Sequence, residues 1–278
     1  MISQIKEGYV RTEEHGRILT IEFFHPQSNS LPASLIEELT KEIHSAGHNE
    51  DIRVIILSSG GDRVFCAGAS FDELAAIQTK DQGTSFFSGF AHVINAMRKC
   101  PQFIIARIQG KCVGGGVGIA AAADYAIAME SAEIKLTELA LGFGPFVVGP
   151  AIERKIGISA FSQLMIDAGL WRSADWARKK GLFAELHSSV EAMDESIRRL
   201  AQTLANGNPE AMRELKRINW HGTENWDHLL LERAALSGNL SLARSPVRQF
   251  KKCAQNGKNH NGPTSRCRPI KIYFPRSS

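Results

Sequence analysis

Two glycine-rich segments contain the first candidates for chemistry. The segment "GKCVGGGVG" at 110–118 separates the apolar run "FIIARI" from an alanine-rich run. The segment "FCAGASFDEL" at 65–74 follows another apolar run, "IRVIILSS", and precedes a helix-like pattern. Glycines between a strand and a helix either cradle a phosphate or bring backbone N–H groups close to a reacting carbonyl. The two functions imply different enzymes.

A phosphate cradle does not fit the spacing of these glycines. The dinucleotide pattern G-x-G-x-x-G fails because Ile119 occupies the third glycine position, and Asp124 follows Gly114 by only ten residues. No Lys-Ser or Lys-Thr follows the glycines, so the P-loop pattern fails as well. Two interpretations stay open. The glycines allow a helix to pack closely on a strand, or two such loops direct N–H donors at one thioester carbonyl and form an oxyanion hole.

The elements that position these loops alternate between strands and helices. A β-hairpin is predicted at 9–24, followed by a helix at 31–47, a strand at 52–59, a helix at 86–100 and a strand at 103–110. The alanine-rich helix and two further strands, at 124–130 and 133–136, come next, and the pattern after residue 150 is mostly helical apart from a strand at 182–187. This alternation predicts an α/β layer architecture.

Composition narrows the class of protein. The 278 residues are 43% hydrophobic and 22% charged, with no apolar run long enough to cross a bilayer. The first residues lack signal-peptide features, and five scattered cysteines favour a reduced protein without a zinc site, so we expect a cytoplasmic protein. The net charge is +4, but residues 251–278 hold seven Lys or Arg and no acid. We expect a disordered basic tail, with neither a nucleic acid nor a membrane as partner.

Three segments together carry a family resemblance. "DRVFCAGASFDEL" at 62–74, "GKCVGGGVGIAAAADYAIA" at 110–128 and "TELALGFGP" at 137–145 resemble, in order and separation, the crotonase superfamily, that is, the enoyl-CoA hydratase/isomerase family. The resemblance implies an α/β fold with a spiral core of ββα turns and a helical C-terminal region that builds homotrimers or homohexamers. We accordingly expect a spiral core at 1–205, a C-terminal helical region at 206–253 and the basic tail at 254–278.

The resemblance also implies residue roles in an acyl-CoA enzyme of fatty acid metabolism. Ala69 and Gly115 would donate the two N–H groups of an oxyanion hole, and Glu138 would act as acid and base. Coenzyme A would be part of the substrate thioester, with no metal or redox cofactor. The expected substrate-binding residues are Ala67, Gly68, Ser70, Phe71, Leu74, Gly114, Gly118, Thr137, Leu141, Gly142 and Phe146.

One departure from the family pattern leaves the reaction open. A typical hydratase has a second glutamate two positions after the glycine triplet, and this position holds Gly118. One carboxylate is the minimum for moving a double bond, whereas hydration also needs a group that positions and deprotonates water. Both a hydratase, which is a lyase, and an isomerase therefore remain candidates. The alternative is an inactive crotonase-like protein that binds acyl-CoA or serves in assembly.

Other polar residues are assigned structural roles. Asp124 is expected to begin a strand or cap the alanine-rich helix, while Asp72 and Glu73 favour a helix start. Cys66 and Cys112 flank the two loops without a histidine nearby in sequence, so we expect buried, unreactive side chains.

Overall fold

Within residues 8–242, the fold contains two β-sheets, and the larger one has six strands. The computed structural model describes residues 8–242, and within them a six-stranded sheet runs in the order β1 (Tyr9–His15), β2 (Ile18–Phe24), β3 (Val54–Ser59), β5 (Phe103–Ile108), β7 (Tyr125–Met129) and β10 (Glu185–His187). Strands β1 and β2 form the predicted antiparallel hairpin, and the other neighbours are parallel. The central strands are buried on both faces, as their continuous apolar runs predict.

The smaller sheet carries the loops of interest. It runs in the order β4 (Val64–Cys66), β6 (Lys111–Val113), β8 (Glu133–Lys135) and β9 (Arg172–Ser173), with β9 antiparallel to β8. Each of β4, β6 and β8 follows a strand of the larger sheet, so the chain alternates between the two sheets and produces repeated ββα turns. Of these four strands only β8 was predicted. Strands β4 and β6 directly precede the glycine-rich turns and were read as part of those loops, and the two residues of β9 are too few for an alternating pattern to show.

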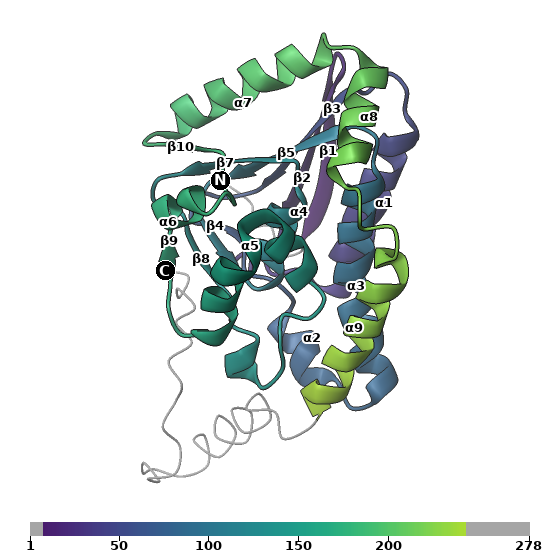
Figure 1. Ribbon diagram of the computed structural model, residues 1–278, viewed down its shortest axis with the longest axis vertical. Helices are drawn as coiled ribbons and strands as arrows, with labels where there is room; N and C mark the ends of the chain where they lie inside the picture. Colours follow the sequence, from purple (N-terminus) through teal and green to yellow (C-terminus); the bar gives the residue numbers. More distant parts are fainter. Residues whose placement is uncertain (1–7, 243–278) are drawn as a thin grey trace, which may run out of the picture.

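Helices cover both faces of the larger sheet. Figure 1 shows α7 (Val190–Ala205) across one side and the remaining large helices on the other. The α7 side chains Met193 and Ile197 pack against Val54 and Ile127 of the sheet in a separate small core. The main core lies on the opposite face, among α1 (Ala33–His48), α3 (Lys80–Lys99), α4 (Gly115–Ala122), α5 (Gly149–Ile166) and α9 (Trp226–Leu242).

Local sequence signals explain where several helices begin and bend. Helix α3 starts six residues before the predicted position because Thr79 and Gln82 form a capping box. In α1, the predicted four-residue apolar spacing is confirmed, since Leu35, Leu39 and Ile43 are all buried. Helix α5 joins two segments that were expected to be separate helices, with a kink at Gly157, whose φ is +76°.

The remaining helices are short or lie after the sheet. They are α2 (Phe71–Ala76), the 3₁₀ helix η1 (Leu139–Leu141), α6 (Ala174–Lys179) and α8 (Pro209–Asn219). Helix α9 lies along α3, as Figure 1 shows. Within residues 8–242, no helix is both long and apolar enough to cross a membrane. The predicted tail at 254–278 lies outside the described residues, and the predicted domain boundary after residue 205 stays a prediction.

A buried ion pair anchors α8 to the core. The Lys216 ammonium lies 2.8 Å from a carboxylate oxygen of Asp124 and donates to the Gln102 carbonyl at 2.7 Å. The same aspartate accepts from the Ile104 N–H at 2.8 Å and from the Trp220 indole N–H at 3.2 Å. Asp124 directly precedes β7, which is one of the two roles expected from the sequence, but its side chain pairs with Lys216 and does not cap α4.

Candidate functional site

The three motif segments meet at one cavity. They are the loop after β4, the glycine cluster after β6 and the Thr137–Glu138 segment after β8, and since β4, β6 and β8 are parallel, their carboxyl ends lie at the same edge of the small sheet. The cavity has a volume of about 80 Å³. Residues from all three predicted segments line it, namely Ala67, Gly68, Ala69, Phe71, Leu74, Gly114, Gly115, Thr137, Glu138, Leu141 and Phe146.

The two glycine loops are in direct contact. A Cβ added to Gly68 would lie 2.8 Å from the Val113 carbonyl oxygen and 3.1 Å from the Gly115 nitrogen. Gly68 also has a φ of +85°, a conformation that other residues rarely adopt. On the neighbouring turn, a Cβ on Gly116 would lie 2.4 Å from the Cys66 carbonyl oxygen. Close packing is therefore one role of the glycines, and it brings the two loops together.

Within the described residues, two backbone N–H groups at this contact have no hydrogen-bond acceptor. Among residues 8–242, no hydrogen bond is donated by the Ala69 N–H or by the Gly115 N–H, whereas the Ser70 N–H donates to the Leu31 carbonyl at 3.1 Å and the Gly114 N–H donates to the Lys135 carbonyl at 2.9 Å. Gly115 is the first residue of α4, where N–H groups lack a partner within the helix. Both free donors belong to residues that line the cavity, so they are available to an oxygen placed there.

Glu138 is the ionisable residue of the cavity. The residue is 8% exposed, and its Oε2 atom is buried without a hydrogen-bond partner among the described residues. Desolvation by burial raises the pKa of this carboxyl from its usual value near 4.5 to about 7, although the backbone N–H groups of Thr137 and Glu138 act in the opposite direction. Its Oε1 atom lies 2.9 Å from the position of a Cβ on Gly114, which places the carboxyl beside the glycine cluster. Near neutral pH such a group can both accept and donate a proton.

The two cysteines near the loops are unsuited to nucleophilic chemistry. Cys66 and Cys112 are fully buried. Burial raises the pKa of the Cys66 thiol to about 12 and that of Cys112 well above its ordinary value. The thiolate form that would attack a thioester is therefore disfavoured at neutral pH, as the sequence led us to expect.

Three predicted substrate-binding residues do not line the cavity. The Ser70 hydroxyl caps α2 by accepting from the Glu73 N–H at 3.4 Å. Gly142 ends η1 with a φ of +93°. Gly118 lies in α4, where an added Cβ would be 2.6 Å from both Cβ and Cγ1 of Val148. The side chain of Val148 therefore fills the space that a side chain at position 118 would enter.

Sequence reasoning missed much of the apolar wall. Phe86, Phe87 and Phe90 of α3, Val148 at the start of α5 and Ser237 of α9 all line the cavity. The spacing of the three phenylalanines, at positions i, i+1 and i+4, was a readable signal, since it places them on one side of a helix. Nothing in the sequence pattern connects Ser237 to the motif loops, because α9 reaches the cavity only through tertiary packing.

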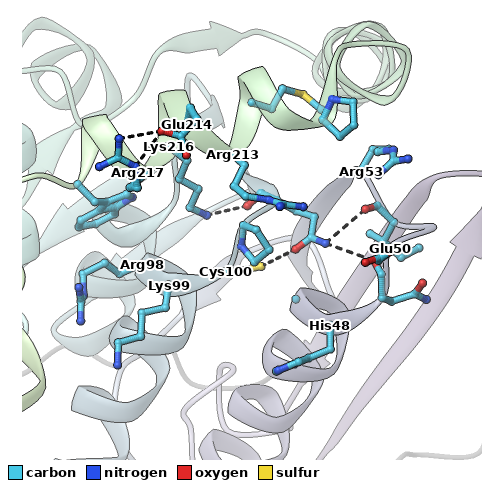
Figure 2. A pocket seen from close by; sticks show the side chains of 18 of the residues that line it. His48, Glu50, Arg53, Arg98, Lys99, Cys100, Arg213, Glu214, Lys216 and Arg217 are labelled. Carbon is cyan, nitrogen blue, oxygen red and sulfur yellow. Dashed lines mark hydrogen bonds and ion pairs between the residues drawn. The ribbon is translucent and has the colours of Figure 1, made fainter.

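Two larger cavities contain none of the predicted site residues. One, of about 1070 Å³, lies between the larger sheet and α7. The other, of about 650 Å³, is drawn in Figure 2 and lies between α8 and the ends of α1 and α3. Many of its charged groups are paired within the protein: Lys216 with Asp124, and Arg217 with Glu214 at 2.7 Å. Because many of the charged side chains that line the cavity of Figure 2 are already paired, we assign this cavity no chemistry.

Comparison with known proteins identifies the family. The sequence profile described as enoyl-CoA hydratase/isomerase matches residues 13–243. The chain belongs to the enoyl-CoA hydratase/isomerase family. A carnitinyl-CoA dehydratase from Salmonella enteritidis PT4 is 30% identical over 206 residues, which cover 73% of this chain and 77% of that protein.

Solved structures of this family share the fold. An enoyl-CoA hydratase from Bacillus halodurans superposes with a TM-score of 0.79 at 22% identity, covering 88% of this chain and 99% of that one. An enoyl-CoA hydratase from Bacillus anthracis gives 0.72 at 26% identity, covering 89% and 96%. The predicted α/β crotonase fold is thus confirmed, with two mixed sheets and C-terminal helices.

Proposed function

We propose that this member of the enoyl-CoA hydratase/isomerase family acts on acyl-CoA thioesters through an oxyanion-stabilised enolate. The Ala69 and Gly115 N–H groups bind the thioester oxygen, and Glu138 moves the proton. One observation carries the proposal: a buried carboxyl with an unpartnered oxygen and a pKa of about 7 lines the same small cavity as two N–H groups that lack acceptors.

The two N–H groups supply the electrostatic part of catalysis. Negative charge develops on the thioester oxygen when a proton leaves the carbon next to the carbonyl, and fixed donors in an apolar cavity stabilise that charge without reorganisation. Removal of one such donor in other enzymes costs about 2.7–4 kcal/mol of transition-state stabilisation. Because Ala69 and Gly115 act through their backbones, their side chains need only be small.

Glu138 supplies the proton transfer. For a 3-enoyl thioester, the ionised carboxylate removes a proton from C2, the electrons shift toward the thioester oxygen, and the protonated carboxyl returns the proton to C4, so that the double bond ends between C2 and C3. No atom is gained or lost. A pKa near 7 populates both forms of the carboxyl at neutral pH, which is the condition for a group that must accept and then donate.

The surroundings of Gly118 favour double-bond isomerisation over hydration. The family resemblance places a second, water-holding glutamate at this position, and Val148 occupies the space beside it. Within the described residues, Glu138 is the one carboxylate that lines the cavity. A hydratase or dehydratase activity, that is, a lyase activity, is the second candidate because a carnitinyl-CoA dehydratase is 30% identical to this chain.

Two thioesters separate these reactions. We expect the purified protein to convert a 3-enoyl-CoA into the conjugated 2-enoyl-CoA, with a rise in the absorbance of the conjugated thioester. Loss of this absorbance from a 2-enoyl-CoA, with formation of the 3-hydroxyacyl product by mass spectrometry, would instead support hydration. Binding of both thioesters without turnover of either would contradict the proposed activity and favour an acyl-CoA binding or assembly protein.

The role of Val148 is tested by restoring the second carboxylate. Gly118→Glu alone is expected to disturb α4, because its side chain meets Val148. In Gly118→Glu/Val148→Gly, which removes both the Cβ and the Cγ1 of Val148, the space is available, and we expect hydration of a 2-enoyl-CoA to appear or increase. Val148→Gly alone is the matched control and is expected to add no hydration. Equal hydration by the single and double variants would contradict this role.

Coenzyme A is proposed to enter along the loop at 67–74, past Ala67, Phe71 and Leu74, which line the cavity.

A homotrimer or homohexamer is also proposed. Large apolar side chains on the surface support it, among them Ile158 and Ile166 of α5 and Leu215 and Ile218 of α8. Light scattering coupled to size-exclusion chromatography measures the state directly, and a monomer at micromolar concentration would contradict it. The expected cytoplasmic location stays a prediction.

A further inference from the structure

Phenylalanine rings form much of the apolar wall of the cavity. Six phenylalanines line it: Phe71, Phe86, Phe87, Phe90, Phe143 and Phe146. Phe87 packs edge-to-face against Phe86, with ring centroids 5.2 Å apart, and against Phe143, with centroids 5.1 Å apart. Such edge-to-face pairs add to the stability that burial alone gives. The rings are therefore held by one another as well as by the core.

The helix crossing behind these rings leaves little room for the wall to move. A Cβ on Gly83 of α3 would lie 2.7 Å from the Cα of Gly238 in α9, so the two backbones touch there. Ser237 precedes this contact and lines the cavity, but its hydroxyl donates to the Arg233 carbonyl at 3.0 Å. This contact fixes α3 against α9, the two helices that carry Phe87 and Ser237 of the cavity wall, and the proton of the Ser237 hydroxyl is already donated within α9.

At the reacting end, the same wall touches the proposed donors. A Cβ on Gly115 would lie 2.2 Å from an atom of the Phe90 ring, so the ring packs directly on the first turn of α4. An acyl chain whose carbonyl oxygen is bound by the Gly115 N–H must therefore pass beside Phe90 into the remaining space.

The volume of the cavity limits the length of that chain. A cavity of about 150 Å³ binds benzene, which is about 25 Å³ for each carbon atom. The 80 Å³ available here corresponds to about three carbon atoms on this scale. Four carbons is the shortest acyl group in which a double bond can move between C3–C4 and C2–C3, so the cavity volume favours acyl groups close to this minimum.

The charge of the cavity limits the chemistry of the chain. Among the described residues 8–242, Glu138 is the one ionisable side chain that lines the cavity, and no Lys, Arg or His lines it. A carboxylate at the end of an acyl chain would be buried without a partner, at a high cost in desolvation. Phenylalanine faces attract quaternary ammonium groups, but such a group with its linking carbons exceeds the volume available.

Resting on the proposed function, we infer that the substrate is the CoA thioester of a short, uncharged acyl group of about four carbon atoms, limited in length by the phenylalanine wall around Phe87. The wall excludes longer chains by volume, and the absence of a cation among the lining residues within 8–242 disfavours carboxylated ones.

A chain-length series tests this inference. We expect kcat/KM for 2- and 3-enoyl-CoAs of four carbons to exceed that for eight carbons by at least about 10-fold, the effect of 1.4 kcal/mol. Chains that end in a carboxylate or a trimethylammonium group should be poorer still. An eight-carbon or charged thioester as the best substrate would overturn the inference but leave the proposed reaction intact. Tight binding of the four-carbon thioester without turnover of any thioester would contradict the reaction while supporting the length limit.

Variants at Phe87 test the wall itself. Phe87→Ala is expected to reduce the preference for four over eight carbons at least about 10-fold by opening space, and Phe87→Leu, which disturbs packing less, should change it in the same direction. Phe161→Ala is the matched control, because Phe161 is as buried as Phe87 but does not line the cavity. An unchanged preference in folded Phe87→Ala and Phe87→Leu, or an equal change in Phe161→Ala, would overturn the assignment.

Discussion

Replacing Glu138 with glutamine should stabilise the protein, and more strongly at high pH. Burial raises the pKa of this carboxyl from near 4.5 to about 7, so the folded state resists ionisation that the unfolded chain undergoes freely. The unfolded state therefore holds fewer protons than the folded state between these two values. The contribution of this carboxyl to the free energy of unfolding is therefore fully present below pH 4.5 and is lost as the pH rises through 7.

The size of the effect follows from the shift. A difference of about 2.5 pKa units corresponds to about 3 kcal/mol once both states are ionised. Relative to a carboxyl that stays protonated, the linkage relation gives a destabilisation by Glu138 of about 3 kcal/mol at pH 8 and about 1 kcal/mol at pH 5. Glutamine has nearly the same shape and does not titrate. The stability gain of Glu138→Gln should therefore be about 2 kcal/mol larger at pH 8 than at pH 5, or about 4–8 °C in Tm.

Urea unfolding at fixed protein concentration, at several pH values between 5 and 8, measures this difference. Glu37→Gln, at an exposed position on α1, is the control for the same chemical change made outside the cavity. A gain for Glu138→Gln that is constant from pH 5 to pH 8 would refute the reasoning, because it would mean that the carboxyl titrates alike in both states.

Three further predictions concern the framework of the site. Lys216→Ala should lower the free energy of unfolding by about 3–5 kcal/mol in urea titrations, because it leaves Asp124 buried without its cation. Lys179→Ala breaks an exposed pair and should change this free energy by less than about 1 kcal/mol, so similar losses in the two variants would contradict the structural role of the buried pair. Gly238→Ala should destabilise the fold by about 1–3 kcal/mol, because the new Cβ would lie 2.5 Å from the Thr84 nitrogen. Gly169→Ala places its Cβ in open space and should not destabilise the fold, so equal melting temperatures for the two variants would argue against the close crossing of α3 and α9. Cys66 and Cys112 should resist alkylation at pH 8 in the native protein and react after unfolding, as mapped by mass spectrometry of the modified peptides, and rapid native labelling of either would show that it is accessible and ionised.

The parts of the fold that were predictable are those with long, periodic patterns. The hairpin at 9–24, the amphipathic helix α1 and the buried strands β3 and β5 were all anticipated, because eight or more residues with consistent spacing report on burial. Strands β4 and β6 were not, because they run directly into the glycine-rich loops, and β9 was not, because it has only two residues. The start of α3 was missed because its capping box precedes the apolar face.

The candidate site likewise contains residues that the sequence predicted and contacts that it did not. The motif loops identified Ala69, Gly115 and Glu138, and these residues line one cavity because the small sheet brings the ends of β4, β6 and β8 together. Their roles remain proposals. The contact between Gly118 and Val148 was beyond sequence reasoning, since 30 residues separate the two positions and only the packing of α4 on α5 joins them. The same holds for the contribution of Ser237 to the cavity.

The most direct test of the central claim is the turnover of a four-carbon 3-enoyl-CoA by Glu138→Ala beside the parent protein. General acid–base groups contribute about 10²- to 10⁴-fold to rates, so we expect kcat to fall by at least about 100-fold while the thioester still binds. Glu133→Ala, which removes a partly exposed carboxylate from the same small sheet, should keep nearly full activity. A kcat for Glu138→Ala within about threefold of the parent would contradict the claim that Glu138 transfers the proton.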